Sequence, residues 1–155
     1  AVRDLWWLYL GLLLFVLPIV FYAAQFPAFQ ARYPFFRGEL RDAGGVDWGM
    51  FAAGQVAYLL IFISGEAFWR GYLLFGLERD FGLYALPMML VPYVVAHYGK
   101  PFPETLGAIA AGFVLGWLAL KHRSFWLGVA VHYGVALSMD LAALWFRAGT
   151  YLNRN

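Results

Sequence analysis

Long apolar runs with few charges constrain the fold of this chain more than any other feature. Residues 5–24 read LWWLYLGLLLFVLPIVFYAA, about twenty apolar residues, which is the length that one α-helix needs to cross a bilayer. This run is longer than the apolar part of an ordinary signal peptide, and no small-residue cleavage site with a polar domain follows it. We therefore expect a retained membrane span.

Four further runs follow, so the sequence predicts about five membrane segments. The second run begins near Trp48 and continues towards Glu78. About thirty residues would make a helix of roughly 45 Å, which exceeds the roughly 30 Å hydrocarbon core, so this helix should tilt or bend. The remaining segments are expected at Leu83–Gly99, Glu104–Lys121 and Ser124–Phe146.

The composition supports one integral membrane domain. Apolar residues make up 63% of the chain and charged residues only 13%, about half the share found in soluble domains. Residues 25–46, where aromatic side chains alternate with Arg32, Arg37 and Arg41, are expected to form an interfacial loop. The predicted fold is all-α: a polytopic transmembrane helix bundle over residues 1–155 that encloses a polar intramembrane cavity. The chain begins with Ala1 instead of Met, so we expect a processed or trimmed protein from which further spans could have been removed.

Charge and cysteine content exclude several classes of function. The net charge is +2 and the basic residues form no run or stripe, so nucleic acid is not expected as a partner. The expected surroundings are the lipid bilayer. The chain has no cysteine, which rules out disulfides, thiolate metal ligands and a cysteine nucleophile.

Ionisable residues inside the predicted spans are the strongest functional signal, because each costs at least about 2.5 kcal/mol at the centre of a membrane helix. Glu66 and Arg70 are four residues apart, so they share a helix face and can pair. One interpretation is a buried ion pair that fixes helix packing. The other is a catalytic carboxylate tuned by a nearby cation.

Two histidines extend this pattern on other segments. His97 closes the third segment and His132 lies within the fifth, and together with Glu66 they could converge on one water molecule or one metal ion. Lys100 and Glu104 flank His97 closely enough to orient it, although Glu104 also suits the first turn of a helix. Asp140 lies about 12 Å along the helix from His132, so it could line the same cavity farther down or approach the far interface.

Three motifs in this order resemble the CPBP family of intramembrane proteases, which includes CAAX-processing, bacteriocin-processing and Abi proteins and the myxosortases. They are GEAFWRGYLL at 65–74, PYVVAHYGKP at 92–101 and SFWLGVAVHYGVALSMD at 124–140. The family pattern is EExxxR, then FxxxH, then HxxxN, on successive membrane helices. The resemblance covers about residues 50–145.

The resemblance implies roles for individual residues of this chain. Glu66 matches the second glutamate of the first motif and Arg70 its arginine, while His97 and His132 match the two histidines. Tyr93 replaces the phenylalanine of the second motif. Two positions depart from the pattern: Gly65 replaces the first glutamate, which is the usual base, and Ala136 replaces the asparagine.

The predicted function is therefore hydrolysis of a peptide bond in or near a membrane-anchored peptide or protein, by water that glutamate and histidine activate. The catalytic residues would be Glu66, His97 and His132, with Arg70, Lys100, Glu104 and Asp140 in support. No cofactor is expected, and a bacterial inner membrane is the expected location. Three alternatives stay open: a non-catalytic binding or immunity protein, a metal-dependent hydrolase that uses Glu66, His97 and His132 as ligands, and a transporter or channel subunit.

Overall fold

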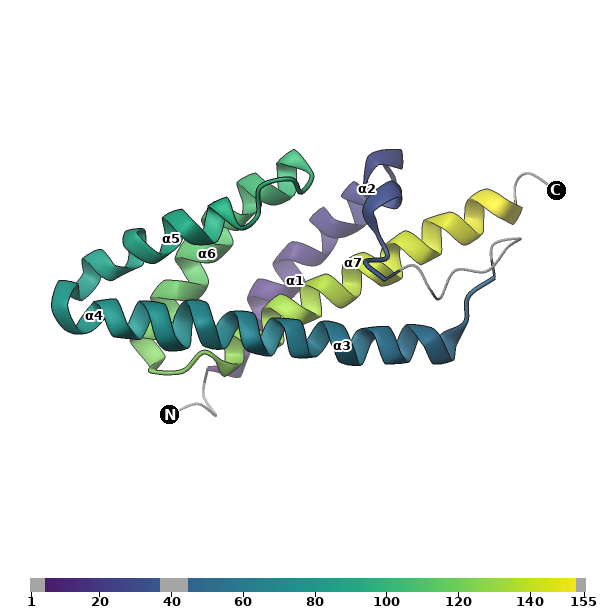
Figure 1. The fold of residues 1–155 in the computed structure, drawn as a ribbon. Coiled ribbons are helices and arrows are strands. Elements are labelled where there is room, and N and C mark those ends of the chain that lie inside the picture. Colours follow the sequence, from purple (N-terminus) through teal and green to yellow (C-terminus); the bar gives the residue numbers. More distant parts are fainter. Residues whose placement is uncertain (1–4, 37–44, 153–155) are drawn as a thin grey trace. The chain divides into compact units, whose positions relative to one another are not determined.

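The computed structural model describes residues 5–36 and 45–152 (Figure 1). These residues form helices and no strand, which confirms the predicted all-α fold. The helices, in chain order, are α1 Trp6–Ala23, α2 Pro27–Arg32, α3 Trp48–Glu66, the π-helix η2 Ala67–Leu74, α4 Phe75–Phe81, the 3₁₀-helix η3 Gly82–Tyr84, α5 Ala85–Val95, α6 Phe102–His122 and α7 Trp126–Leu152.

Four helical stretches among the described residues are long and apolar enough to cross a membrane: Trp6–Ala23, Trp48–Val95, Phe102–His122 and Trp126–Arg147. The sequence predicted about five segments, and the difference lies in Trp48–Val95. Its 48 residues contain the second predicted segment and most of the third, Leu83–Gly99, joined through η3 without a loop. The chain is an integral membrane protein.

A glycine allows the change of direction between these two parts. Gly82 follows α4 with a φ of 55°, a left-handed conformation in which a Cβ atom would be strained. After it, α5 packs against α6 and η2 (Figure 1). With 11 residues, α5 is about 16 Å long, so it is shorter than a full span.

The described residues form two compact units. Of the described residues, one unit contains 5–6 and 63–129, and the other contains 7–36, 45–62 and 130–152. The single membrane domain over 1–155 stays a prediction. Of the predicted interfacial loop 25–46, the structure describes 25–36 and 45–46, and α2 lies within it. Arg37 and Arg41 lie outside the described residues.

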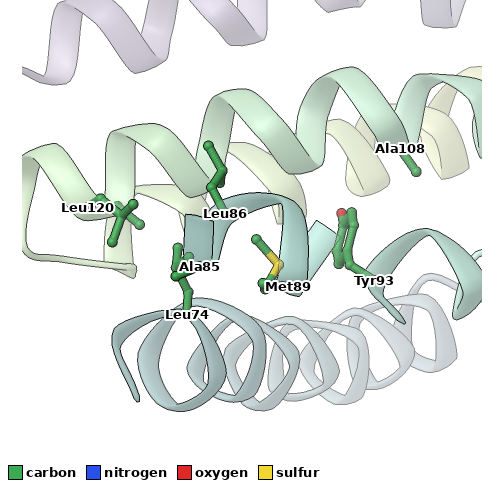
Figure 2. Close-up of a cluster of buried hydrophobic side chains, with 8 residues drawn as sticks. Leu74, Ala85, Leu86, Met89, Tyr93, Ala108 and Leu120 are labelled. Carbon is green, nitrogen blue, oxygen red and sulfur yellow. The ribbon is translucent and has the colours of Figure 1, made fainter. Parts of the chain in front are cut away.

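The core of the unit 63–129 lies between η2, α5 and α6 (Figure 2). Its buried members are Leu74, Ala85, Leu86, Met89, Tyr93, Ala108, Ala119 and Leu120. Two glycines let α6 approach α5 closely. A Cβ atom at Gly112 would lie 2.6 Å from Leu90 and 2.8 Å from the ring of Tyr93, and one at Gly116 would lie 2.6 Å from Leu86. Small residues at these two positions therefore allow close helix packing, as is common in membrane proteins.

The core of the other unit joins α1, α2 and α7. The buried members are Val20, Ala24, Phe29, Tyr33 and Ala143. The Phe21 and Phe146 rings pack with their centroids 5.0 Å apart, which ties α1 to α7. Large apolar side chains on the outer faces of the helices stay exposed, as expected for surfaces that face lipid.

Candidate functional site

Glu66 and Arg70 form a buried ion pair at the junction of α3 and η2. Glu66 is the last residue of α3 and is 2% exposed, while Arg70 lies inside η2 and is fully buried. Nη1 of Arg70 donates a hydrogen bond of 2.6 Å to Oε1 of Glu66. The pairing predicted from the four-residue spacing is confirmed. Because the pair is removed from solvent, burying its two charges costs free energy that other interactions of the fold must offset.

The π-helix is a feature of the site that the sequence did not predict. η2 begins at Ala67, directly after Glu66, and ends at Leu74. A π-helix forms hydrogen bonds between residues five apart and occurs mostly as short insertions, often at functional sites. Arg70 and Leu74 both point into the protein from it. The irregularity therefore falls on the segment that carries the ionisable pair.

Tyr93 on α5 connects this pair to His97. The Cζ atom of Arg70 lies 4.4 Å from the centroid of the Tyr93 ring, within the range of a cation–π contact. The Tyr93 ring also lies next to the ring of His97, and the two ring centroids are 4.5 Å apart. Tyr93 is 2% exposed. Glu66, Arg70, Tyr93 and His97 thus follow one another in contact within the unit 63–129.

The imidazole of His97 contacts the backbone of α5. Nδ1 lies 2.8 Å from the backbone oxygen of Tyr93. A carbonyl oxygen can only accept a hydrogen bond, so Nδ1 carries a hydrogen in this contact. His97 is partly exposed in the turn after α5.

The turn after α5 holds the backbone of His97 in place. Its N–H donates to Val94 over 2.9 Å, and its carbonyl accepts from the Thr105 hydroxyl at 3.0 Å and from the Lys100 N–H at 3.2 Å. Gly99 has a φ of 88°, which favours glycine and lets the chain reverse towards α6. Thr105 was not singled out in the sequence. A hydroxyl in the first turn of the next helix was its only signal.

Lys100 and Glu104 pair with each other across the start of α6. Their Nζ and Oε1 atoms are 2.7 Å apart, and both side chains are partly exposed. Glu104 lies in the first turn of α6, where the helix dipole favours a negative charge, so its predicted place at a helix start is confirmed. This ion pair connects the turn that follows His97 to the first turn of α6.

The other two predicted residues lie on α7 in the other unit. The His132 ring packs against Phe62 with centroids 4.5 Å apart. Asp140 is fully buried and accepts hydrogen bonds from the Phe35 N–H at 2.9 Å and from Nε2 of Gln55 at 2.8 Å. Asp140 therefore fixes the segment after α2 to α3 and α7. Convergence of His132 with Glu66 stays a prediction.

Gly65 and Ala136 are the two positions that depart from the family motifs. Gly65 is half-buried in α3, and a Cβ atom there would meet nothing within 4 Å. Ala136 is buried in α7. Within residues 5–36 and 45–152, no three side chains of His, Asp or Glu are grouped in a way that could hold a metal ion.

Comparison with known proteins identifies the family. The family model described as type II CAAX prenyl endopeptidase Rce1-like matches residues 47–138, more than half of the chain. The match includes Glu66, Arg70, His97 and His132. No curated protein and no solved structure matches the chain. The chain therefore belongs to the Rce1-like family of type II CAAX prenyl endopeptidases, a family of intramembrane proteases.

Proposed function

We propose that this protein hydrolyses a peptide bond in or next to a membrane-anchored substrate, with Glu66 as the general base. The observation that carries the proposal is the contact chain from Glu66 through Arg70 and Tyr93 to His97, in a member of a protease family. A carboxylate held away from bulk water can accept a proton from a bound water molecule. The substrate class we propose is a prenylated C-terminal peptide, as the family description indicates.

The proposed reaction needs no covalent intermediate. The water oxygen attacks the carbonyl carbon of the scissile bond while its proton passes to the Glu66 carboxylate. His97 takes part as the imidazolium, in which Nε2 also carries a hydrogen, and Nε2 donates a hydrogen bond to the oxyanion of the tetrahedral intermediate. The carbon–nitrogen bond then breaks, and the proton held by Glu66 passes to the leaving nitrogen. The products are a new carboxyl group and a free amine.

Arg70 has a positioning role in this scheme. It holds Oε1 of Glu66 and is itself held by the Tyr93 ring, so the carboxylate has little freedom to rotate. His132 is proposed as a second assisting residue, because it matches the last histidine of the family motif. Lys100 and Glu104 are proposed to support His97 through the turn that they close.

A second candidate function is a membrane binding or immunity protein without protease activity. Gly65 and Ala136 favour it, because both replace polar residues of the family motifs. The two functions differ in one measurable respect. A protease creates new peptide termini that depend on Glu66, whereas a binding protein creates none.

The experiment is a mass-spectrometric map of peptide termini in membranes from cells that make the wild-type chain, the Glu66→Gln variant or no chain. We expect termini that only the wild-type sample contains, because the amide cannot accept a proton from water. Such termini would also locate the cleavage site. Identical termini in all three samples would refute the proteolytic function and favour the binding protein.

The placement of His132 has its own test. The chain has no cysteine, so a variant with Glu66→Cys and His132→Cys would carry only two thiols. The proposal predicts that a thiol cross-linker with a span of about 10 Å joins them, since a water-bridged site cannot be larger. A Glu66→Cys and Glu78→Cys variant is the matched control. Failure to cross-link positions 66 and 132 would remove His132 from the mechanism.

A further inference from the structure

Gly128 lies in the first turn of α7 and faces Glu66. A Cβ atom at position 128 would lie 2.9 Å from Oε2 of Glu66 and 3.7 Å from its Cδ. The first distance is shorter than Cβ atoms tolerate, so a side chain there would force the carboxylate or the helix to move. Both residues belong to the unit 63–129.

The carboxylate has little room to withdraw from Gly128, because its other oxygen is fixed. Oε1 accepts the 2.6 Å hydrogen bond from Arg70. Arg70 is fully buried, and the ring of Tyr93 covers its guanidinium group. The carboxylate is therefore held between a guanidinium group and the backbone of α7.

The chain that leads into α7 is held against η2 at a second point. A Cβ atom at Gly71 would lie 3.3 Å from the ring of Phe125, which immediately precedes α7. Phe125 comes three residues before Gly128, and Gly71 comes five residues after Glu66, so the two contacts are about one helical turn apart. The helix cannot move away from Glu66 without disturbing the contact between Phe125 and Gly71.

We propose that Gly128 is a positioning residue that fixes the Glu66 carboxylate for attack on the substrate. This inference rests on the proposed role of Glu66 as the base. Because position 128 lacks a side chain, the backbone of α7 determines where Oε2 lies. A methyl group there would displace the proton acceptor from the water molecule, and a displacement of about 1 Å can cost about 100-fold in rate.

The kinetic test uses Gly128→Ala, Glu66→Asp and the double variant, on the peptide that the map of termini identifies. We expect Gly128→Ala to lower kcat about 10- to 100-fold with KM within about twofold, because the carboxylate is misplaced while substrate binding is unchanged. Aspartate is one methylene shorter and withdraws from the added methyl group. In the Glu66→Asp background, Gly128→Ala should therefore lower kcat by less than about threefold. Gly76→Ala in α4, where a Cβ atom meets nothing within 4 Å, is the control.

Thermal unfolding of the wild type and the same variants tests the contact without any measurement of activity. Gly128→Ala should lower the unfolding temperature of the wild type more than that of Glu66→Asp. If Gly128→Ala fails to accumulate in membranes, adding Glu66→Asp should restore its accumulation. Equal losses in the two backgrounds, in rate and in unfolding temperature, would overturn the role of Gly128. Activity retained by Glu66→Gln would instead refute the proposed role of Glu66 as the base, and the unfolding data alone would then test the contact between Gly128 and Glu66.

Discussion

The buried pair of Glu66 and Arg70 allows chemistry and folding to be separated by a double-mutant cycle. The three variants are Glu66→Leu, Arg70→Met and the double variant. In the wild type, Nη1 of Arg70 lies 2.6 Å from Oε1 of Glu66. Arg70 is 0% exposed and Glu66 is 2% exposed, so solvent screens neither charge. Each single variant leaves one uncompensated charge in the protein interior, and such a loss costs about 3–5 kcal/mol.

The double variant should behave differently. It removes both charges and places apolar side chains in the same space, a change that is often neutral or stabilising in protein interiors. We expect its free energy of unfolding to lie within about 1 kcal/mol of the wild type, whereas additive losses would amount to about 6–10 kcal/mol. The protein should nevertheless be inactive, because Glu66 is absent.

The assay is reversible unfolding in mixed micelles, followed by circular dichroism, with cleavage measured on the same samples. A double variant that is stable but inactive would show that the pair is retained for chemistry. Single losses below about 1 kcal/mol, as for exposed pairs, would refute the burial argument. Additive losses in the double variant would refute the coupling of the two side chains.

Three further predictions follow from single contacts. Gly112→Ala should destabilise the protein by about 1–2 kcal/mol, because the added methyl group overlaps Leu90 and Tyr93, and the cost of this overlap exceeds the gain in helix propensity. Thermal unfolding measures the loss, and Gly107→Ala, where the added methyl group meets open space, is the control. Asp140→Ala should cost about 1–3 kcal/mol for each donor left unpaired, yet leave the cleavage rate of the folded protein unchanged; a lower rate would mean that Asp140 acts in catalysis. Thr105→Val should weaken the hold on His97 and lower kcat, whereas Thr105→Ser should not, and equal rates for both variants would contradict the role of the hydroxyl.

The helices were predictable because they depend on runs of apolar residues. The predicted first span Leu5–Ala24 and the helix Trp6–Ala23 agree to one residue at each end. The fifth segment was predicted to end at Phe146, but α7 continues to Leu152, so Arg147 and the residues after it extend the helix beyond the apolar run. A helix can extend past the hydrocarbon core into the interface, and hydropathy does not record that extension.

The π-helix after Glu66 was not predictable from the sequence. Its residues, AFWRGYLL, carry no periodicity that distinguishes hydrogen bonds five residues apart from those four residues apart. The outcome depends on packing against α5, α6 and Phe125, which no local pattern contains.

The site was predictable in part. The spacing of Glu66 and Arg70 was enough to predict their pairing, because residues four apart share a helix face. The link through Tyr93 was missed, although Tyr93 and His97 have the same spacing. An aromatic residue in a membrane segment has many ordinary roles, so its contact with a buried arginine becomes visible only when α5 is packed against η2. Asp140 was predicted to support the site, and its hydrogen bonds to Phe35 and Gln55 depend on a contact across about 100 residues of sequence.

The most direct test of the account is the rate at which the purified protein in lipid vesicles cleaves the mapped peptide, compared with the Glu66→Gln variant in a single turnover. Glutamine has nearly the same shape and keeps a carbonyl oxygen for Arg70, so it removes the base with little change in packing. The account predicts a rate about 100- to 10,000-fold lower for the variant at unchanged peptide binding. Equal rates for the two proteins would contradict the assignment of Glu66 as the catalytic base.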